Sequence, residues 1–456
     1  MSEEFDKRLP LSPAQRGIWF ADQVDAAQRN YNIGARVDIS GRIDTATLQT
    51  AVRMAIEETD ALRLRFVDED DGPWQYVETS ARSELSVVDL SSSPEPRTAA
   101  DHWIQRDLMR PVPIVGAELS RWALLKTGPD ESTLYLRFHH IAIDGYSVFL
   151  VARRVADIYT GTLDGTAREF PPADSFEQIL HDELSYSTRK SCQRDKKYWS
   201  GRLAGAAPLT LAGTAAPASE TFLRTTTYVS SAQTKALREV AENLGSSPAG
   251  IVLAATALYL NRTAVDGESR LGLVVSRRMN PMALRVPCMM ADILPLVLAP
   301  RPSQSLRDIL RETSRETSQV LRHQRYRSED LKRDLDLVGT GDRLFGPVVN
   351  VMEYDGRLNF GECQASIDGL LAWPVDDFAI NVYSNQASSQ IRIDFDANPA
   401  VYTETDLANH QRRLLAMLDT LVMSDPGQPV ASIDLLDERE RHQVLVEWNA
   451  TTRPVP

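Results

Sequence analysis

The sequence predicts a mixed α/β fold built from two units. Its 456 residues are enough for two or three folded units. Helix-like and strand-like patterns alternate in both halves, as is typical of α/β architectures. A Gly- and Thr-containing stretch that ends in Pro171 and Pro172 is the best candidate boundary between the halves. We therefore assign residues 1–172 to a first unit, 173–437 to a second, and the polar, Pro-bearing tail 438–456 to a linker.

In the first unit, a capped helix is followed by a strand. Asp44 can cap a helix whose apolar residues Leu48, Val52 and Ile56 recur at helical spacing. The sequence LRLRFV, from Leu62, then has the composition of a strand.

A second strand of this unit leads directly into two histidines. Apolar side chains alternate over residues 134–138, which is the period of a strand, and His139 and His140 follow. After Gly145 the apolar residues of 148–158 recur at helical spacing, so a helix is expected there.

The second unit repeats this mixture. We expect an apolar helix over residues 249–260, a strand from Leu271, an amphipathic helix from Ser305 to about Gln324, and a strand from Gly346. No sequence repeat of fixed period is present, so any kinship between the units would be one of fold alone.

Composition and charge restrict the function. The longest apolar run, 249–260, is too short to span a bilayer and the first residues are charged, so we predict a cytoplasmic protein without a membrane partner. A net charge of −13 opposes nucleic-acid binding. Cys192, Cys288 and Cys363 form no CxxC pair, so neither a disulfide framework nor a metal site is indicated and we interpret them as packing residues.

The segment FHHIAIDGYS, residues 138–147, carries the candidate chemistry. Neighbouring residues of a strand point to opposite faces, so His139 and His140 cannot share one role. Asp144 could accept a bond from an arginine or orient an imidazole, and Gly145 permits a tight passage into the next helix. From these residues alone, structural histidines with a helix-capping aspartate are as well supported as a catalytic site. Zinc is less well supported, because adjacent histidines diverge and no third ligand is near.

Motifs along the chain resemble those of condensation domains of nonribosomal peptide synthetases. HHIAIDGYS fits the signature HHxxxDGxS, and LSPAQRGIWF from Leu11, followed by YNI, resembles the first motif. DALRLRF resembles the second motif, with Arg63 at its arginine but Thr59 where its histidine would stand. Further similar segments begin at Ser276, His323 (HQRYRSEDL) and Arg343. The matches occur in the family's order.

The resemblance implies a V-shaped pseudo-dimer of two chloramphenicol acetyltransferase-like lobes, with the histidine loop at their junction. It implies an acyltransferase that joins a carrier-bound donor thioester to the α-amine of a carrier-bound acceptor. The phosphopantetheine arms of a donor carrier and an acceptor carrier would enter one tunnel from opposite ends, and no cofactor would be bound directly. The segment VLVEWNATTRPVP resembles the connection to a downstream adenylation domain. We expect a monomer.

Other reactions share this fold. Heterocyclising relatives replace both motif histidines with aspartate, and plant-type acyl-CoA transferases carry a DFGWG motif that this chain lacks. The intact histidine pair favours an enzyme. A catalytically silent docking domain that recruits a tailoring enzyme, and an epimerisation domain, remain as alternatives.

The resemblance also implies roles for the residues of the histidine loop. His140 would accept a hydrogen bond from the acceptor amine, position it and take its proton, while His139 would pack behind the site. Asp144 would be a structural acid that pairs with Arg278. Arg277 would point the opposite way on a continuing strand.

Further residues follow from the same resemblance. Gly145 would offer its backbone N–H to the substrate. Asn350 and Ser147 would line the substrate tunnel, and Arg63 and Arg278 would support the structure.

Within the family, several segments resemble the first condensation domain of enterobactin-type siderophore synthetases. These are LRLRF, HQRY, LFGPVVN and the acidic VDD at Val375–Asp377. If Met1 is the natural start, too few residues precede Leu11 to hold a carrier domain. We therefore predict an aryl or other N-blocked acyl donor supplied in trans.

Overall fold

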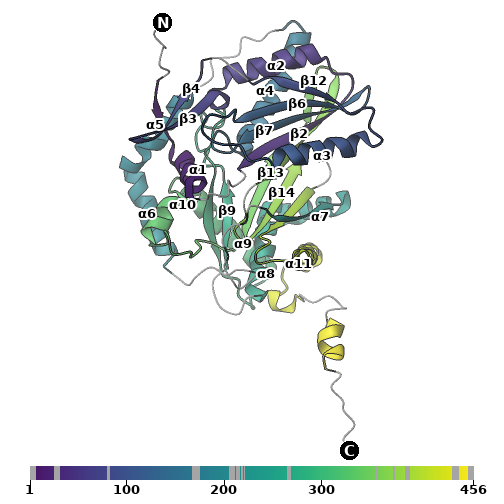
Figure 1. Ribbon diagram of the computed structural model, residues 1–456. Coiled ribbons are helices and arrows are strands. Elements are labelled where there is room, and N and C mark those ends of the chain that lie inside the picture. The colour runs from purple at the N-terminus through teal and green to yellow at the C-terminus, as the bar shows by residue number, and fades with distance from the viewer. Residues whose placement is uncertain are drawn as a thin grey trace, which may run out of the picture.

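A computed structural model gives the architecture of the chain. The residues that it describes are 7–24, 31–79, 83–166, 175–204, 211, 216, 219, 221–263, 269–354, 357–372, 375–385, 391–433 and 441–449. The predicted boundary at Pro171 and Pro172, and residues 438–440 and 450–456 of the predicted linker, lie outside this range. Two lobes, each with its own sheet, lie against one another (Figure 1), so the predicted mixed α/β fold with two lobes is present.

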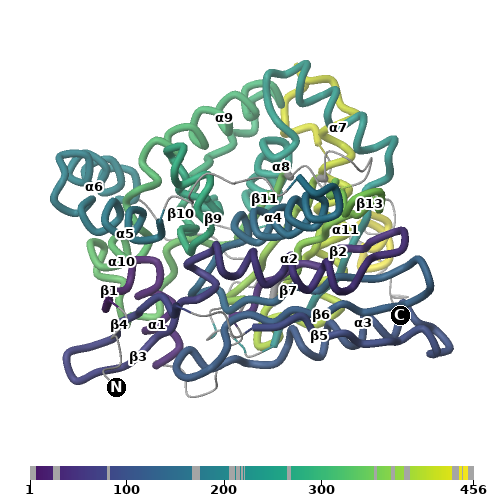
Figure 2. The backbone as a smooth tube through the Cα atoms, turned by 90° about the horizontal axis from the view of Figure 1, so that it is seen from above, coloured from purple at the N-terminus to yellow at the C-terminus, as the bar shows by residue number. Residues whose placement is uncertain are grey.

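The sheet of the first lobe has the strand order β12-β13-β2-β7-β6-β5 in the described residues. From its own half of the chain it takes β2 (Asn32–Ser40), β5 (Leu85–Asp89), β6 (Ser120–Lys126) and β7 (Glu131–His139). Helices α2 (Thr45–Glu58) and α4 (Gly145–Leu163) lie side by side on one face (Figure 2), and α3 (Pro96–Leu108) covers the other.

The two helices that the sequence predicts in this lobe are present. Asp44 caps α2 by accepting a hydrogen bond from Thr47 N. α4 begins at Gly145, and the apolar residues that predict it, Val148, Val151, Val155 and Ile158, are buried. The strand predicted from Leu62 begins only at Leu64, because Asp60–Arg63 form a 3-10 helix before β3 (Leu64–Glu69).

The sheet of the second lobe has the order β10-β9-β11-β14-β15-β8 in the described residues. The strands are β8 (Leu223–Val229), β9 (Ser269–Val275), β10 (Asp292–Leu298), β11 (Val348–Tyr354), β14 (Phe378–Asn385) and β15 (Ile391–Ala397). The helices α7 (Ser231–Asn243), α8 (Pro248–Thr263), α9 (Leu306–Arg322) and α11 (Glu404–Met423) supply apolar side chains to one core on this sheet.

One pair of strands from the second half of the chain crosses the junction and joins the sheet of the first lobe. β12 (Arg357–Phe360) and β13 (Cys363–Ala372) come from the second half of the chain, yet β13 pairs antiparallel with β2 of the first lobe. Residues 357–372 therefore belong to the first sheet, and a single boundary at residue 172 does not separate the two sheets. A strand pair that crosses to the other lobe ties the lobes together through backbone hydrogen bonds.

Smaller elements surround this frame. A short sheet joins β1 (Leu9–Pro10), β4 (Gly72–Val77) and β3. The helices α1 (Pro13–Val24), α5 (Phe176–Ser185), α6 (Lys190–Arg202) and α10 (Ser328–Asp334) complete the described helical elements near the site.

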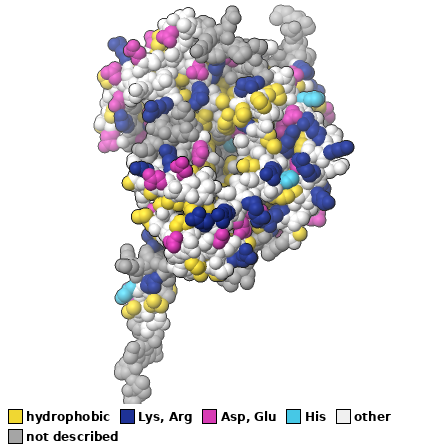
Figure 3. All heavy atoms as spheres, turned by 180° about the vertical axis from the view of Figure 1, so that it is seen from behind, with side chains coloured by type: hydrophobic (Ala, Val, Ile, Leu, Met, Phe, Trp, Pro, Cys, Tyr) yellow, Lys and Arg dark blue, Asp and Glu magenta, His cyan; other side chains and the backbone are white. Residues whose placement is uncertain are grey.

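In the described part of the chain, no single helix is long and apolar enough to cross a membrane. The helices α7 and α8, bent by 92° relative to each other, would together be long and apolar enough to cross a membrane by length and composition only. α8 is buried in the core of the second lobe. On the face drawn in Figure 3, basic and acidic side chains are interspersed around a hollow near its middle.

Candidate active site

The histidine loop connects β7 to α4 and is anchored by Asp144. Asp144 caps α4, because its Oδ1 accepts hydrogen bonds from the backbone N of Ser147 at 2.9 Å and from its hydroxyl at 2.8 Å. A second oxygen, Oδ2, accepts from the backbone N–H groups of Met290 and Ala291 at 3.1 and 3.2 Å. The carboxylate therefore joins the loop of the first lobe to a segment of the second half of the chain.

Arg278 provides the positive charge opposite Asp144. Its Nη2 lies 3.0 Å from Asp144 Oδ1 and 3.1 Å from Oδ2, and the two side chains are 0% and 1% exposed. The same guanidinium donates to the carbonyl groups of Ala283, Val286 and Cys288. The predicted Asp144–Arg278 pair is therefore present, and Arg278 also holds the loop that follows it.

This pairing determines the charge state of Asp144. Burial alone would raise the pKa of the carboxyl, but the charge of Arg278 and the hydrogen bonds from Ser147 outweigh burial, so the pKa lies below its usual value. Asp144 is ionised at neutral pH and its oxygen atoms are occupied. The arrangement fits a structural acid and leaves no lone pair directed to a substrate proton.

Ser147 belongs to the same buried cluster. Its hydroxyl accepts from Arg278 Nη2 at 2.7 Å and from Cys288 N at 2.9 Å, and the residue is 0% exposed. This position corrects the predicted role in the substrate tunnel, because an enclosed hydroxyl with these partners is not presented to a ligand.

Arg277 does not continue a strand as predicted. β9 ends at Val275, and Arg277 takes a positive φ of 56°, so the alternation of a strand no longer applies. Both arginines can therefore be buried. Arg277 Nη1 forms an ion pair with Glu183 Oε2 at 2.9 Å, and its Nε donates to Gln324 O at 2.9 Å.

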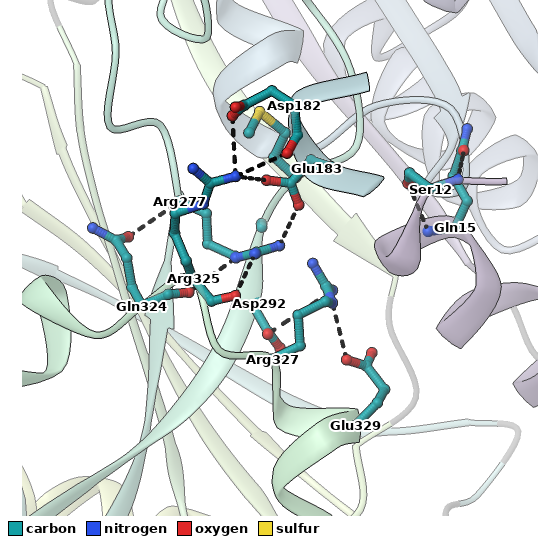
Figure 4. A network of polar contacts seen from close by, with 12 residues as sticks. Ser12, Gln15, Asp182, Glu183, Arg277, Asp292, Gln324, Arg325, Arg327 and Glu329 are labelled. Atoms are coloured by element: carbon teal, nitrogen blue, oxygen red, sulfur yellow. Dashed lines mark hydrogen bonds and ion pairs between the residues drawn. The ribbon is translucent and has the colours of Figure 1, made fainter. Parts of the chain in front are cut away.

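Figure 4 shows that this pair is part of a larger network. Arg325 bonds to Asp182 of α5, and Arg327 lies between Asp292 and Glu329. Because apolar residues of α5 pack into the core of the first lobe, the network ties that lobe to the HQRYRSEDL segment of the second half. The segment is therefore a support for the lobe junction.

His139 is enclosed behind the loop. It is 1% exposed, its Nδ1 accepts from Ile141 N at 3.1 Å, and its ring lies 6.1 Å from that of Tyr31. Burial, followed by the charges of His140 and Arg137, lowers the pKa of His139 to about 3. These contacts are those of a neutral, packed imidazole.

His140 is also buried, at 7% exposure. Burial lowers its pKa, and the nearby charge of Asp144 opposes this shift in part. A neutral imidazole keeps one ring nitrogen as a hydrogen-bond acceptor, which is the property needed to bind an amine N–H.

Gly145 lies where α4 meets the second lobe. A Cβ at this position would lie 3.3 Å from Met352 Sδ of β11 and 3.7 Å from Ile33 Cδ1 of β2. A Cβ would be tight against the Met352 thioether and in ordinary contact with Ile33, so little room for a side chain is present here. The side chain of Met352, from β11, therefore lies next to the start of α4.

Asn350 lies on β11, two residues before Met352, and thus on the same face of the strand. It is half-buried, and its Nδ2 donates to Asn381 Oδ1 at 3.2 Å. Neither Met352 nor Asn381 was predicted as a site residue. The period-two alternation of β11 places Met352 on the face of Asn350, whereas Asn381 depends on the pairing of β11 with β14, which no local pattern indicates.

Arg63 lies apart from the histidine loop, at the end of the 3-10 helix. It donates to Glu78 O at 2.7 Å and forms an ion pair with Asp60 at 2.9 Å. These contacts fix a turn of the first lobe, in keeping with a supporting role. Thr59, at the position of the missing motif histidine, is buried before that turn.

Among the described residues, no group of three or more His, Cys, Asp or Glu side chains is placed to hold a metal ion. The three cysteines are free thiols. Cys288 is enclosed, and burial raises the pKa of its thiol to about 12. Cys192 and Cys363 pack at the edges of the two main cores.

Comparison with known proteins identifies relatives of this arrangement. The family model described as condensation domain matches residues 6–445. The chain is 37% identical over 454 residues to the dimodular nonribosomal peptide synthase of Bacillus subtilis (strain 168). The aligned residues cover 99% of this chain and 19% of that protein. A crystal structure of a double variant of the starter condensation domain of rhizomide synthetase, in complex with C8-CoA and Leu-SNAC, matches with a TM-score of 0.87 and 36% identity, covering 96% of this chain and 100% of that one.

The predicted enterobactin-type relationship is a more distant one. Enterobactin synthase component F of Escherichia coli (strain K12) is 27% identical over 459 residues, which cover 99% of this chain and 35% of that protein. The chain thus spans about a third or less of the length of these two synthetases.

Proposed function

Since the chain belongs to the condensation domain family, whose reaction is amide-bond formation, we propose that it is a starter condensation domain acting on an aliphatic acyl donor. The acceptor in this proposal is an aminoacyl thioester. The observation that carries the proposal is the complete His140 loop, held by the buried Asp144–Arg278 pair. The rhizomide starter domain, crystallised with C8-CoA and Leu-SNAC, supports an aliphatic donor over the aryl donor that the sequence suggested.

The proposed reaction is attack of the acceptor amine on the donor thioester carbonyl. The C–N bond forms, the C–S bond breaks, and the proton lost by nitrogen goes to the departing thiolate. A free α-amine has a pKa of about 7.7–8.0, so part of it is already nucleophilic near neutral pH. His140 accepts an N–H bond from the amine and directs its lone pair to the carbonyl. Holding both groups together contributes most, because oriented reactants reach effective molarities of about 10⁵–10⁸ M.

The remaining residues and partners belong to the same proposal. His139 and Asp144 keep the loop in place, and Gly145 offers its backbone N–H to a substrate. Both substrates arrive on phosphopantetheine thioesters, so the partners are a donor carrier, which would act in trans, an acceptor carrier and a downstream adenylation domain. We propose a monomer in the cytoplasm. Its first lobe would comprise residues 1–172 and the crossing strands β12 and β13, and its second lobe the rest of residues 173–437. The family match and the starter-domain relative favour amide formation over the silent docking domain and the epimerisation domain.

A donor panel tests the proposal. The protein is incubated with an aminoacyl-loaded acceptor carrier and, in separate reactions, with octanoyl, salicyl, dihydroxybenzoyl or aminoacyl donors, each on CoA and on a free-standing carrier. We expect the octanoyl group to be transferred fastest, because the donor end of the site would accept an extended alkyl chain, and mass spectrometry of the acceptor measures the product. Turnover with the aminoacyl donor alone would refute the starter assignment but not amide formation. No amide with any donor would refute both.

The pH dependence of turnover tests the role of His140. Because burial lowers the pKa of His140, its imidazole stays neutral below the ordinary histidine pKa. The acceptor amine is therefore the group that is protonated first as pH falls, and a protonated amine is not a nucleophile. We expect turnover to decline below about pH 7.7–8.0 and the midpoint to move down with a less basic acceptor amine. A midpoint that stays fixed across acceptors of different basicity would show that an enzyme group titrates instead.

A further inference from the structure

A chain of polar side chains crosses the second sheet and ends at Asn350. Asn350, Asn381 and Asp394 are direct neighbours on β11, β14 and β15, and Asp396 lies two residues beyond Asp394 on the same face. The opposite face of these strands carries the apolar core of the second lobe. The polar face is therefore the one that also carries Met352, which contacts Gly145 (β11 and α4 in Figure 2).

The hydrogen bonds along this chain converge on Asp396, which accepts from both sides. Arg224 of β8 binds Asp396 with two bonds, Nε to Oδ1 at 2.6 Å and Nη2 to Oδ2 at 2.8 Å. Asn381 Nδ2 donates to Asp396 Oδ2 at 2.9 Å, and Asn350 Nδ2 donates to Asn381 Oδ1 at 3.2 Å. Because both oxygen atoms of Asp396 accept from Arg224, the side chain presents acceptors to Asn381 and determines which end of the Asn381 amide faces it. Asn381 in turn determines the orientation of Asn350.

The middle of the chain is buried and its two ends, Arg224 and Asn350, are half-buried. Asp396 and Asn381 are each 2% exposed, whereas Asn350 is half-buried. Among the described residues, no hydrogen bond to Asn350 Oδ1 is present, so this oxygen is the acceptor that the chain leaves for a ligand at the β11 end. Asn350 is two residues from Met352, which is about 7 Å along the strand, and the Met352 side chain lies next to Gly145 at the start of α4.

We propose that Arg224, Asp396 and Asn381 are positioning residues that present the carbonyl oxygen of Asn350 to an N–H of the acceptor amine. This inference rests on the proposed function, because it assigns a second hydrogen-bond acceptor to the same substrate nitrogen. Two acceptors, His140 and Asn350, orient an amine lone pair better than one, because they fix two of its N–H directions. An Asn350 amide turned the other way would present a donor to the amine and would oppose binding.

The test compares two isosteric substitutions on one strand. Asp396→Asn removes the group that sets the amide direction. Asp394→Asn is the matched control, because Asp394 bonds to Thr226 and Arg392 and not to Asn381. With saturating octanoyl donor, we expect Asp396→Asn to lower kcat/KM for the aminoacyl acceptor about three- to tenfold through its KM, the value of one net hydrogen bond, and to leave the donor KM unchanged. Asp394→Asn should leave both unchanged.

A double-mutant cycle with Asn350→Ala separates positioning from a structural effect. If Asp396 acts through Asn350, Asp396→Asn has no further effect on acceptor KM in the Asn350→Ala background. Asn381→Leu, which interrupts the chain but keeps the Arg224–Asp396 pair, should reproduce the KM change if Asp396→Asn proves unstable on thermal melting. Additive effects, or equal effects of Asp394→Asn and Asp396→Asn, would overturn the inference. Absence of amide product from the wild-type protein would instead overturn the proposed function.

Discussion

Arg278→Ala should prevent stable folding, and not merely slow turnover. The substitution leaves the carboxylate of Asp144 buried without a counter-charge, which costs about 3–5 kcal/mol. It also removes the donor to the carbonyl groups of Ala283, Val286 and Cys288, so the loop after β9 loses these bonds and keeps those to Asp144 and Ser147. We expect little soluble protein, or a melting temperature lowered by many degrees in a thermal unfolding assay.

Two controls show whether charge or packing is responsible. Arg285→Ala, an exposed arginine of the same loop, should change the melting temperature little. Arg278→Lys keeps the charge but loses the planar fork that reaches several acceptors at once, so it should fall between the wild type and Arg278→Ala. A soluble Arg278→Ala protein that melts like the wild type would contradict a stabilising role for the pair.

The local elements of the fold could be predicted from sequence because their signals are local. Asp44 caps α2, and Ser305 caps α9, as the side-chain chemistry and the apolar spacing indicate. The alternation over residues 134–138 predicted β7, and Gly145 marked the start of α4. The Asp144–Arg278 pair joins residues far apart in the chain, and only the family resemblance, not spacing, pointed to it.

What the sequence could not predict depends on long-range contacts. Nothing in residues 357–372 indicates that β13 pairs with β2, because strand partners are chosen by the packing of the whole lobe. The bend at Arg277 was missed for a similar reason. A non-glycine residue with positive φ is unfavourable by itself, and here it is held by Glu183 and the Gln324 backbone, which lie far away in sequence. The same holds for the hydrogen-bonded chain from Asp396 to Asn350.

His140→Ala should fold and lose most amide formation. If His140 orients the acceptor amine and takes part in its proton transfer, its removal lowers kcat by roughly 10²–10⁴-fold. The substitution removes a neutral ring from the loop but leaves the Asp144–Arg278 pair and the cap of α4 intact. Single-turnover assays with an octanoyl donor and an aminoacyl acceptor carrier measure the rate, and thermal melting measures the fold.

His139→Ala is the matched comparison, because the two histidines are neighbours with different surroundings. His139 accepts a bond from Ile141 N and packs near Tyr31, so its loss opens a cavity and leaves a buried N–H unpaired. We expect His139→Ala to lower the melting temperature first, and the protein that remains folded to keep a larger share of its rate than His140→Ala. Near wild-type amide formation by His140→Ala would remove His140 from the mechanism. Equal loss of rate at unchanged stability in both variants would show that the two histidines act together. That result would contradict a catalytic role for His140 and a packing role for His139.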